Sequence, residues 1–331
     1  MVKPKVYVTR QLFDEAIEIL EEHAEVEVYE GVDDAIPREL LLEKVADVEG
    51  LLPLLTERID AEVMDAAKGL KVISNYAVGY NNIDVAAATE RGIYVTNTPG
   101  ILTDTTADAA FALLMAVARR IPEADRHVKE GGWVHAWGPR MYVGTDVHGK
   151  TLGIIGLGRI GSAVAKRAKG FDMNIVYYDE YRRRDLEGEL GVRYAPLKEL
   201  LTESDYVSLH VPLLASTRHM IGKKELTMMK ETAFLINTSR GPVVDEDALY
   251  KALRDGDIAG AGLDVFEREP LSPDSPLKGL DNAVTTPHIA SASVETRTKM
   301  ATTAASNLVS VLQGKKPPNL VNPDVLKIRP M

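Results

Sequence analysis

The sequence predicts an α/β protein made of two doubly wound, parallel-sheet domains of the Rossmann-like kind. Three observations predict it. Short runs rich in β-branched residues alternate with segments of helical period along the whole chain. Most of these runs are apolar at every position instead of every second one, which indicates parallel strands covered by helices on both faces. At 331 residues the chain also exceeds the usual size of a single core, so two domains are expected.

The first alternating series occupies residues 1–100. Its expected strands are Lys5–Thr9, Glu25–Tyr29, Gly50–Leu55, Val72–Asn75 and Tyr94–Thr96. The expected helices between them are Leu12–His23, Arg38–Ala46, Asp60–Ala67 and Ile83–Arg91. The segment Asn97–Gly100 (NTPG) contains proline and glycine and ends the series.

The second series begins after a helix and an irregular segment. An alanine-rich helix is expected at Thr105–Arg120, and we interpret the region around 121–150 as an arm. Helices such as Ile160–Gly170 and Asp245–Asp255 then separate the strands, with Asp245 as a helix N-cap. The expected strands are Thr151–Ile155, Asn174–Tyr178, Tyr206–Leu209, Phe234–Asn237, Gly260–Asp264 and Ala283–Thr285.

The last long helix, expected at Ser293–Gln313, follows the complete second sheet and could return to pack on the first domain. We therefore predict a discontinuous, flavodoxin-like domain, residues 1–100 plus 290–331, that binds the substrate. The other domain, residues 101–289, is predicted to be the Rossmann domain that binds a dinucleotide. We expect the reaction to take place in a cleft between the two domains.

The composition excludes several classes of protein. A net charge of −10 without a long block of lysine and arginine argues against a nucleic-acid partner. The absence of cysteine excludes disulfides, thiolate metal sites and a cysteine nucleophile. Dispersed acids and histidines predict no metal site. Because no signal-like segment or long apolar run is found, we expect a cytoplasmic protein without a membrane partner.

A dinucleotide-binding motif is the sharpest local signal. It consists of Gly156, Gly158, Arg159, Ile160 and Gly161, with Leu157 between the first two glycines. Alone, this glycine pattern would also fit a tight turn without a ligand. Its position between an expected strand and an expected helix favours a pyrophosphate site, because glycines permit close approach and the helix N-terminus attracts phosphate.

Asp179 lies 18 residues after Gly161, at the end of the next expected strand. A carboxylate there accepts hydrogen bonds from ribose hydroxyls and repels a 2′-phosphate, which favours NAD. The run Arg182–Arg184 leaves NADP possible, since these side chains could instead accept the 2′-phosphate.

Three charged residues follow three strands of the second series. Arg240, Glu269 and His288 come after the strands expected to end at Asn237, Asp264 and Thr285. Parallel strands present their carboxyl ends at one edge, where ligands bind. Reduction of a carbonyl needs a proton donor, which histidine provides, and a carboxylate orients and stabilises the imidazolium. An arginine can hold a substrate carboxylate with two hydrogen bonds.

Alternatives remain when each residue is taken alone. His210 also ends an expected strand of the second sheet and could be the proton donor instead of His288. A single arginine or glutamate at these positions could be an ordinary loop residue, and Asp264 could be a turn former. The evidence is that the three residue types are expected at one edge.

The motifs quoted above, with others, resemble those of the D-isomer-specific 2-hydroxyacid dehydrogenases, particularly the glyoxylate and hydroxypyruvate reductases. The resemblance covers nearly the whole chain in one order. The segments that carry it are NYAVGYNNID (Asn75–Asp84), NTPGILTDTTAD (Asn97–Asp108), GLGRIG (Gly156–Gly161), SLHVPL (Ser208–Leu213), INTSRGPVVDEDAL (Ile236–Leu249), AGLDVFEREP (Ala261–Pro270) and TPHIASAS (Thr286–Ser293).

The resemblance implies NAD(P)H-dependent reduction of a small 2-oxo acid to the D-2-hydroxy acid by a homodimer. It implies that Arg240 binds the substrate, that His288 is the general acid/base, and that Glu269, not Glu267, is its partner. The further substrate contacts that it implies are Leu54, Val78, Gly79, Trp137 and Met141. The further cofactor contacts are Thr106, Val211, Pro212, Thr238 and Asp264.

Two departures from the family pattern affect the interpretation. Arg140 stands where an apolar residue is common, so a dianionic substrate is possible, and Ala290 replaces a usual glycine with little expected effect. Other members of the family leave alternatives open: a D-lactate, 3-phosphoglycerate or phosphite dehydrogenase, or a corepressor-like protein that senses NAD(H).

Overall fold

A computed structural model describes residues 2–31 and 34–331. The chain divides into two compact units, one formed by residues 1–102 with 292–331 and the other by residues 103–291. Of the helices in the described ranges, none is both long and apolar enough to cross a membrane. Both units are α/β structures with fully parallel sheets, as predicted.

The first unit contains a five-stranded sheet in the order β2-β1-β3-β4-β5. Its strands are β1 (Lys5–Val8), β2 (Glu25–Val28), β3 (Gly50–Leu52), β4 (Val72–Ser74) and β5 (Tyr94–Thr96). Its helices are α1 (Asp14–His23), α2 (Arg38–Lys44), α3 (Ala61–Ala66), α4 (Val85–Glu90), α12 (Val294–Leu312) and α13 (Val325–Ile328). Because all strands are parallel, their carboxyl ends lie at one edge of the sheet.

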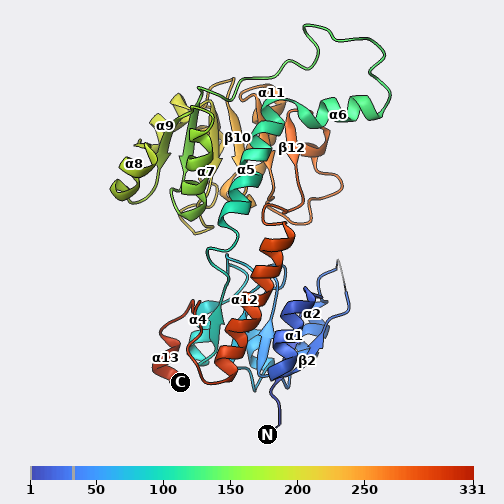
Figure 1. Ribbon diagram of the computed structural model, residues 1–331, viewed down its shortest axis with the longest axis vertical. Helices are drawn as coiled ribbons and strands as arrows, with labels where there is room; N and C mark the ends of the chain where they lie inside the picture. The colour runs from blue at the N-terminus through green and yellow to red at the C-terminus, as the bar shows by residue number, and fades with distance from the viewer. Residues whose placement is uncertain (1, 32–33) are drawn as a thin grey trace. The chain divides into compact units, whose positions relative to one another are not determined.

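Helices cover both faces of this sheet. Val6 and Val8 of β1 belong to the core formed with α1 and α12, whereas Tyr7 belongs to the core formed with α2, α3 and α4. Figure 1 shows α1 and α12 side by side. The last long helix therefore packs on the first sheet. Its N-terminus is capped by Ser293, whose hydroxyl accepts a hydrogen bond from the backbone N–H of Thr296 at 3.2 Å.

The second unit contains a seven-stranded sheet in the order β12-β11-β10-β9-β6-β7-β8. Its strands are β6 (Thr151–Ile155), β7 (Asn174–Tyr178), β8 (Arg193–Tyr194), β9 (Tyr206–Leu209), β10 (Phe234–Asn237), β11 (Gly260–Leu263) and β12 (Ala283–Thr285). Its helices are α5 (Thr103–Ala118), α6 (Ile121–Lys129), α7 (Arg159–Lys169), α8 (Arg184–Leu190), α9 (Leu197–Glu203), α10 (Lys223–Leu226) and α11 (Glu246–Asp255).

Two separate cores cover the two faces of this sheet. Residues of α5 and α7 form one core with the sheet, and residues of α9, α10 and α11 form the other. Figure 1 shows α5 and α7 adjacent on one face. The predicted N-cap of α11 is confirmed, since the Asp245 carboxylate accepts a hydrogen bond from the N–H of Ala248 at 2.9 Å.

Several boundaries differ from the prediction. The strand expected at Gly50–Leu55 ends at Leu52, because Pro53 has no N–H for the sheet and Leu54 donates its N–H to the Glu57 carboxylate at 2.7 Å instead. Helix α6 was not expected. None of its residues is buried, so it contributes no side chain to the cores that cover the sheet.

The arm continues after α6 as residues 130–150, without helix or strand. Figure 1 shows it leaving the rest of the second unit and returning before β6. Val147 is buried in the core, but most other apolar side chains of the arm are exposed, with 82% of Trp137, 74% of Val134 and 57% of Trp133 accessible to solvent. Such a group of exposed apolar side chains is unusual for the surface of a monomer.

Candidate active site

The glycine motif forms a tight turn between β6 and α7. Gly156 has a φ of +94°, and a Cβ atom there would lie 2.9 Å from the carbonyl carbon of His210. A Cβ atom on Gly161 would lie 2.1 Å from the carbonyl oxygen of Gly156. Close packing therefore requires glycine at both Gly156 and Gly161, and the backbone conformation requires it in addition at Gly156.

Gly158 has a different role, because a Cβ atom there would meet nothing within 4 Å. It is the N-cap of α7, and no side chain of the described residues caps this helix end. The backbone N–H groups of Arg159 and Ile160 therefore lie in the first turn of the helix, next to open space. Such unpaired N–H groups at a helix N-terminus stabilise a bound anion. This arrangement fits the pyrophosphate of a dinucleotide.

Asp179 directly follows β7 and contacts the same turn. Its Oδ2 atom accepts a hydrogen bond from the N–H of Leu157 at 2.8 Å. The guanidinium of Arg183 donates to the carbonyl oxygen of Leu157 at 3.2 Å and is also paired with Asp185 at 2.7 Å. Arg182 makes two hydrogen bonds to Glu187, at 2.7 and 2.9 Å. Both arginines are thus already engaged by carboxylates.

Other predicted cofactor residues lie at the carboxyl edge of this sheet or on α5. Val211 and Pro212 follow β9, and a Cβ atom on Gly156 would lie 2.9 Å from Cγ1 of Val211. Thr106, on α5, is buried. The buried Thr238 hydroxyl, just after β10, has no hydrogen-bond partner among the described residues. An unsatisfied buried hydroxyl is costly, so Thr238 fits a site completed by a ligand.

The structure brings His288 and Glu269 together from two loops. Nδ1 of His288 lies 2.7 Å from Oε2 of Glu269, and Oε1 of Glu269 accepts the N–H of Phe266 at 3.1 Å. Burial opposes ionisation of Glu269, yet the hydrogen bond and positive charge of His288, with the charge of Arg240, lower its pKa. Because Nδ1 is held by the carboxylate, Nε2 is the ring atom that remains for a substrate.

Asp264 holds the loop that carries His288. Its Oδ1 atom accepts the Thr286 hydroxyl at 2.6 Å and the Ile289 N–H at 2.8 Å, and its Oδ2 atom accepts the Ala290 N–H at 2.8 Å. The backbone N–H of His288 donates to the carbonyl oxygen of Asp264 at 2.9 Å. These contacts fix a backbone in which His288 has a φ of +54°. A cofactor contact of Asp264 stays a prediction.

Arg240 follows β10 and is held by its own loop. The Asn237 side chain donates to the backbone oxygen of Arg240 at 3.0 Å, and the guanidinium donates to the carbonyl oxygen of Ser239 at 2.7 Å. Burial lowers the pKa of Arg240, and the negative charge of Glu269 opposes this effect in part. A guanidinium stays charged even so, and this electrostatic coupling links Arg240 to the His288–Glu269 pair.

His210, the rival proton donor, has a different environment. Its Nε2 atom lies 2.8 Å from the Ser208 hydroxyl, and burial lowers its pKa to about 4. A neutral imidazole is therefore favoured near neutral pH, which makes His210 a poor proton donor there. Glu267 likewise has another partner, because its Oε1 atom lies 2.5 Å from Nε2 of His219.

The predicted residues of the first unit follow β3 and β4. Leu54 is half-buried. The backbone oxygens of Val78 and Gly79 accept hydrogen bonds from the side chains of Asn97 and Asn75, both at 2.8 Å. Sequence reasoning did not identify these two asparagines, although both lie in the quoted motifs. The exposed Trp137 and the partly exposed Met141 lie on the arm of the second unit.

Comparison with known proteins agrees with this geometry. A family model described as the NAD binding domain of D-isomer specific 2-hydroxyacid dehydrogenases matches residues 111–290. A glyoxylate reductase of Korarchaeum cryptofilum is 59% identical over 330 residues, which cover 99% of each chain. A solved structure from Thermus thermophilus is 49% identical, with a TM-score of 0.90, and the match covers 96% of this chain and 99% of that chain.

A third relative was solved with a nucleotide. The NADPH-dependent glyoxylate/hydroxypyruvate reductase of Sinorhizobium meliloti, in complex with NADP and malonate, is 34% identical with a TM-score of 0.84, and the match covers 98% of each chain. The dinucleotide cradle and these matches define the class, an oxidoreductase with a nicotinamide cofactor. The chain belongs to the D-isomer-specific 2-hydroxyacid dehydrogenases.

Proposed function

We propose that this protein reduces glyoxylate or hydroxypyruvate to the corresponding D-2-hydroxy acid, with NADH as the preferred cofactor. The observation that carries the proposal is the His288–Glu269 pair, joined at 2.7 Å and electrostatically coupled to Arg240. The name glyoxylate reductase borne by the Korarchaeum cryptofilum relative supports the choice of substrate.

Each charged residue has one task in this reaction. The nicotinamide, when bound, supplies the hydride that reaches the 2-carbon of the acid. Arg240 holds the substrate carboxylate with charge-assisted hydrogen bonds. His288 gives the proton on Nε2 to the 2-oxygen, where negative charge develops, and Glu269 stabilises the protonated imidazole and orients its ring.

Residues of the first unit complete the proposed binding of substrate. The peptide groups of Val78 and Gly79 offer N–H donors to the substrate carboxylate, and Leu54 contacts its carbon chain. The hydrogen bond that Asn97 donates to the backbone oxygen of Val78 supports this role, because it fixes the peptide group that carries the Gly79 N–H. The bond from Asn75 to the backbone oxygen of Gly79 holds the next peptide group of the same loop.

The preference for NADH rests on the environment of Asp179. Its carboxylate contacts the glycine turn, where a ribose would lie, and a 2′-phosphate there would be repelled. Arg182 and Arg183 are held by Glu187 and Asp185, which reduces their capacity to bind a phosphate.

We also propose that the protein is a homodimer in which the arm contacts the partner. The exposed apolar side chains of the arm, Trp137 foremost, support this. Trp137 and Met141 are proposed to reach the substrate site of the partner.

The experiment that tests the function is oxidation of NADH and NADPH, followed at 340 nm, with a panel of 2-oxo acids. We expect glyoxylate and hydroxypyruvate to be the best substrates and His288→Ala to lower kcat by at least about 100-fold, the usual contribution of a general acid. His219→Ala is the matched control, since His219 pairs with Glu267 in the same unit. Comparable turnover of His288→Ala and wild type would exclude the assigned proton donor.

A further inference from the structure

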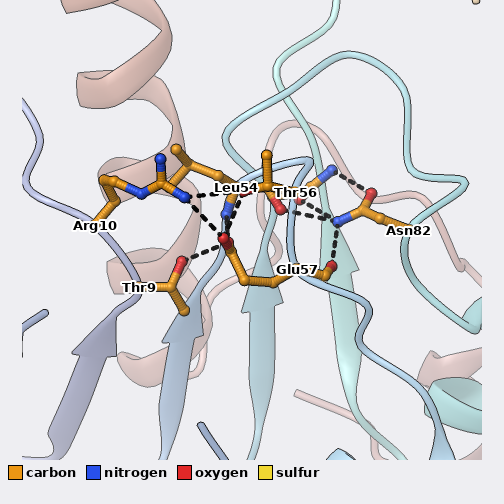
Figure 2. Close-up of polar contacts among 7 residues, drawn as sticks. Thr9, Arg10, Leu54, Thr56, Glu57 and Asn82 are labelled. Atoms are coloured by element: carbon orange, nitrogen blue, oxygen red, sulfur yellow. Dashed lines mark hydrogen bonds and ion pairs between the residues drawn. The ribbon is translucent and has the colours of Figure 1, made fainter. Parts of the chain in front are cut away.

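A carboxylate to which no role has been assigned above is buried at the carboxyl edge of the first sheet. The side chain of Glu57 is 2% exposed, and Figure 2 shows it surrounded by polar groups of neighbouring loops. Its Oε2 atom accepts the Thr9 hydroxyl and the Leu54 N–H, both at 2.7 Å. Its Oε1 atom accepts the Thr56 hydroxyl at 2.5 Å and the Arg10 guanidinium at 3.3 Å.

The network joins the loops that follow three strands. Thr9 and Arg10 follow β1, and Leu54 to Glu57 follow β3. Asn82, in the loop after β4, donates to the backbone oxygens of Leu54 and Glu57 at 3.0 and 3.1 Å, as Figure 2 shows. The amide of Asn82 also pairs with Asn75, the residue whose side chain holds the backbone oxygen of Gly79 at 2.8 Å.

Such a network is not explained by stability alone. Removing an ion pair from water costs several kcal/mol per ion, and apolar residues of similar volume often stabilise a fold as well or better. What the network provides is a fixed position, because four donors converge on one carboxylate and leave it little freedom to move. The groups that it fixes are Leu54, through its N–H and backbone oxygen, and Gly79, through the two asparagines.

We propose that Glu57 is a positioning residue for substrate binding: with Arg10 and Asn82 it fixes Leu54 and, through Asn75, Gly79, where they contact the 2-oxo acid. The inference rests on the proposed function, because these contacts belong to it. Glu57 acts only through the loops and takes no part in proton transfer.

Glu57→Gln is the sharpest test. All four groups that contact the carboxylate donate hydrogen bonds to it, and each of its two oxygens accepts two of these bonds. In glutamine an NH2 group takes the place of one oxygen, so two of the four hydrogen bonds lose their acceptor. We expect KM for glyoxylate to rise at least about tenfold, while KM for NADH and kcat at saturation change less than about twofold. The ratio of kcat/KM for glyoxylate to that for hydroxypyruvate should also change, because Leu54 shifts.

Leu20→Ala is the matched control for general destabilisation. Leu20 is fully buried near the end of α1, in the core with α12, and its truncation weakens the same unit without touching the carboxyl edge. This variant should lower Tm and leave both KM values unchanged. If Glu57→Gln does not fold, Thr9→Val replaces it, since that variant removes one donor and keeps the shape.

The outcomes separate the two proposals. If the wild type reduces no 2-oxo acid, the proposed function fails. If the wild type is active but Glu57→Gln, or Thr9→Val in its place, keeps the wild-type KM for glyoxylate, the positioning role is excluded. An equal rise of KM in Leu20→Ala would also exclude it, because the effect would then be a general loss of stability.

Discussion

Replacing Glu269 with glutamine should slow the reaction in both directions while leaving cofactor binding unchanged. The variant keeps the size of the side chain and removes the negative charge 2.7 Å from Nδ1 of His288. Reduction uses His288 as the proton donor and oxidation of the hydroxy acid uses it as the proton acceptor, so both directions need the ring held with Nε2 toward the substrate. A glutamine side chain can present either its oxygen or its NH2 group to Nδ1, so it orients the ring less well.

The size of the loss follows from the contact and its exposure. A hydrogen bond to a charged group contributes about 1.5–3 kcal/mol. The His288 and Glu269 side chains are 25% and 32% exposed, so solvent screening weakens the contact and the lower end of this range applies. Since about 1.4 kcal/mol corresponds to a factor of ten in rate, kcat/KM should fall at least about tenfold.

The assay is kcat/KM for glyoxylate reduction and for glycolate oxidation at pH 7, on wild type and variant. Glu267→Gln is the control, because Glu267 lies two residues earlier and pairs with His219. It should leave both values of kcat/KM unchanged. Values for Glu269→Gln that stay within about twofold of the wild type would refute the role assigned to Glu269.

Three further predictions concern other parts of the chain. Asp179→Ala should raise the kcat/KM ratio of NADPH to NADH at least about tenfold, since it removes the carboxylate that repels a 2′-phosphate; an unchanged ratio would mean that another group reads the ribose. Burial lowers the pKa of His210 from 6.5 to about 4 in the folded protein, so the unfolded protein takes up a proton at this residue first as the pH falls. The neutral residue therefore contributes at most about 3 kcal/mol to stability above pH 6.5, and this contribution is lost between pH 6.5 and pH 4. Urea titrations of the wild type and of His210→Gln measure this contribution as the difference between their free energies of unfolding. This difference should be smaller at pH 4 than at pH 7, and an equal difference at the two pH values would contradict the prediction. Trp137→Glu should convert a dimer to monomers in sedimentation experiments without lowering Tm by more than a few degrees, because the side chain is 82% exposed within its own chain; an unchanged dimer would remove the arm from the interface.

Most strands were predictable because they are buried on both faces of their sheet. A strand such as Tyr206–Leu209 is apolar or small at nearly every position and lies in the middle of seven strands, so its bounds are given by the sequence pattern itself. The edge strand β8 was not predicted, since its two residues, Arg193 and Tyr194, carry no such pattern. Helix α6 was missed for a different reason. It is short, with nine residues, and Pro122 in its first turn also fits the irregular segment that was predicted there.

From the residue pattern alone, only those site residues that follow the ends of strands could be predicted. Arg240, Glu269 and His288 follow neighbouring strands β10, β11 and β12, and the parallel order alone predicts that they share an edge. The sequence could not distinguish His210 from His288 without the family resemblance, because both follow strands. Burial and the Ser208 contact make the difference, and both depend on the packing of residues distant in sequence.

Asp264 illustrates what a motif leaves out. Asp264 directly follows β11, and its carboxylate accepts three hydrogen bonds from the loop after β12. One buried side chain thus fixes the path of the residues around His288. The left-handed backbone of His288, with a φ of +54°, costs on the order of 1–3 kcal/mol in a residue other than glycine. Hydrogen bonds to a charged acceptor contribute about 1.5–3 kcal/mol each, so the Asp264 contacts can offset that strain. The Asp264 contacts therefore stabilise the strained backbone from which the imidazole of His288 contacts Glu269.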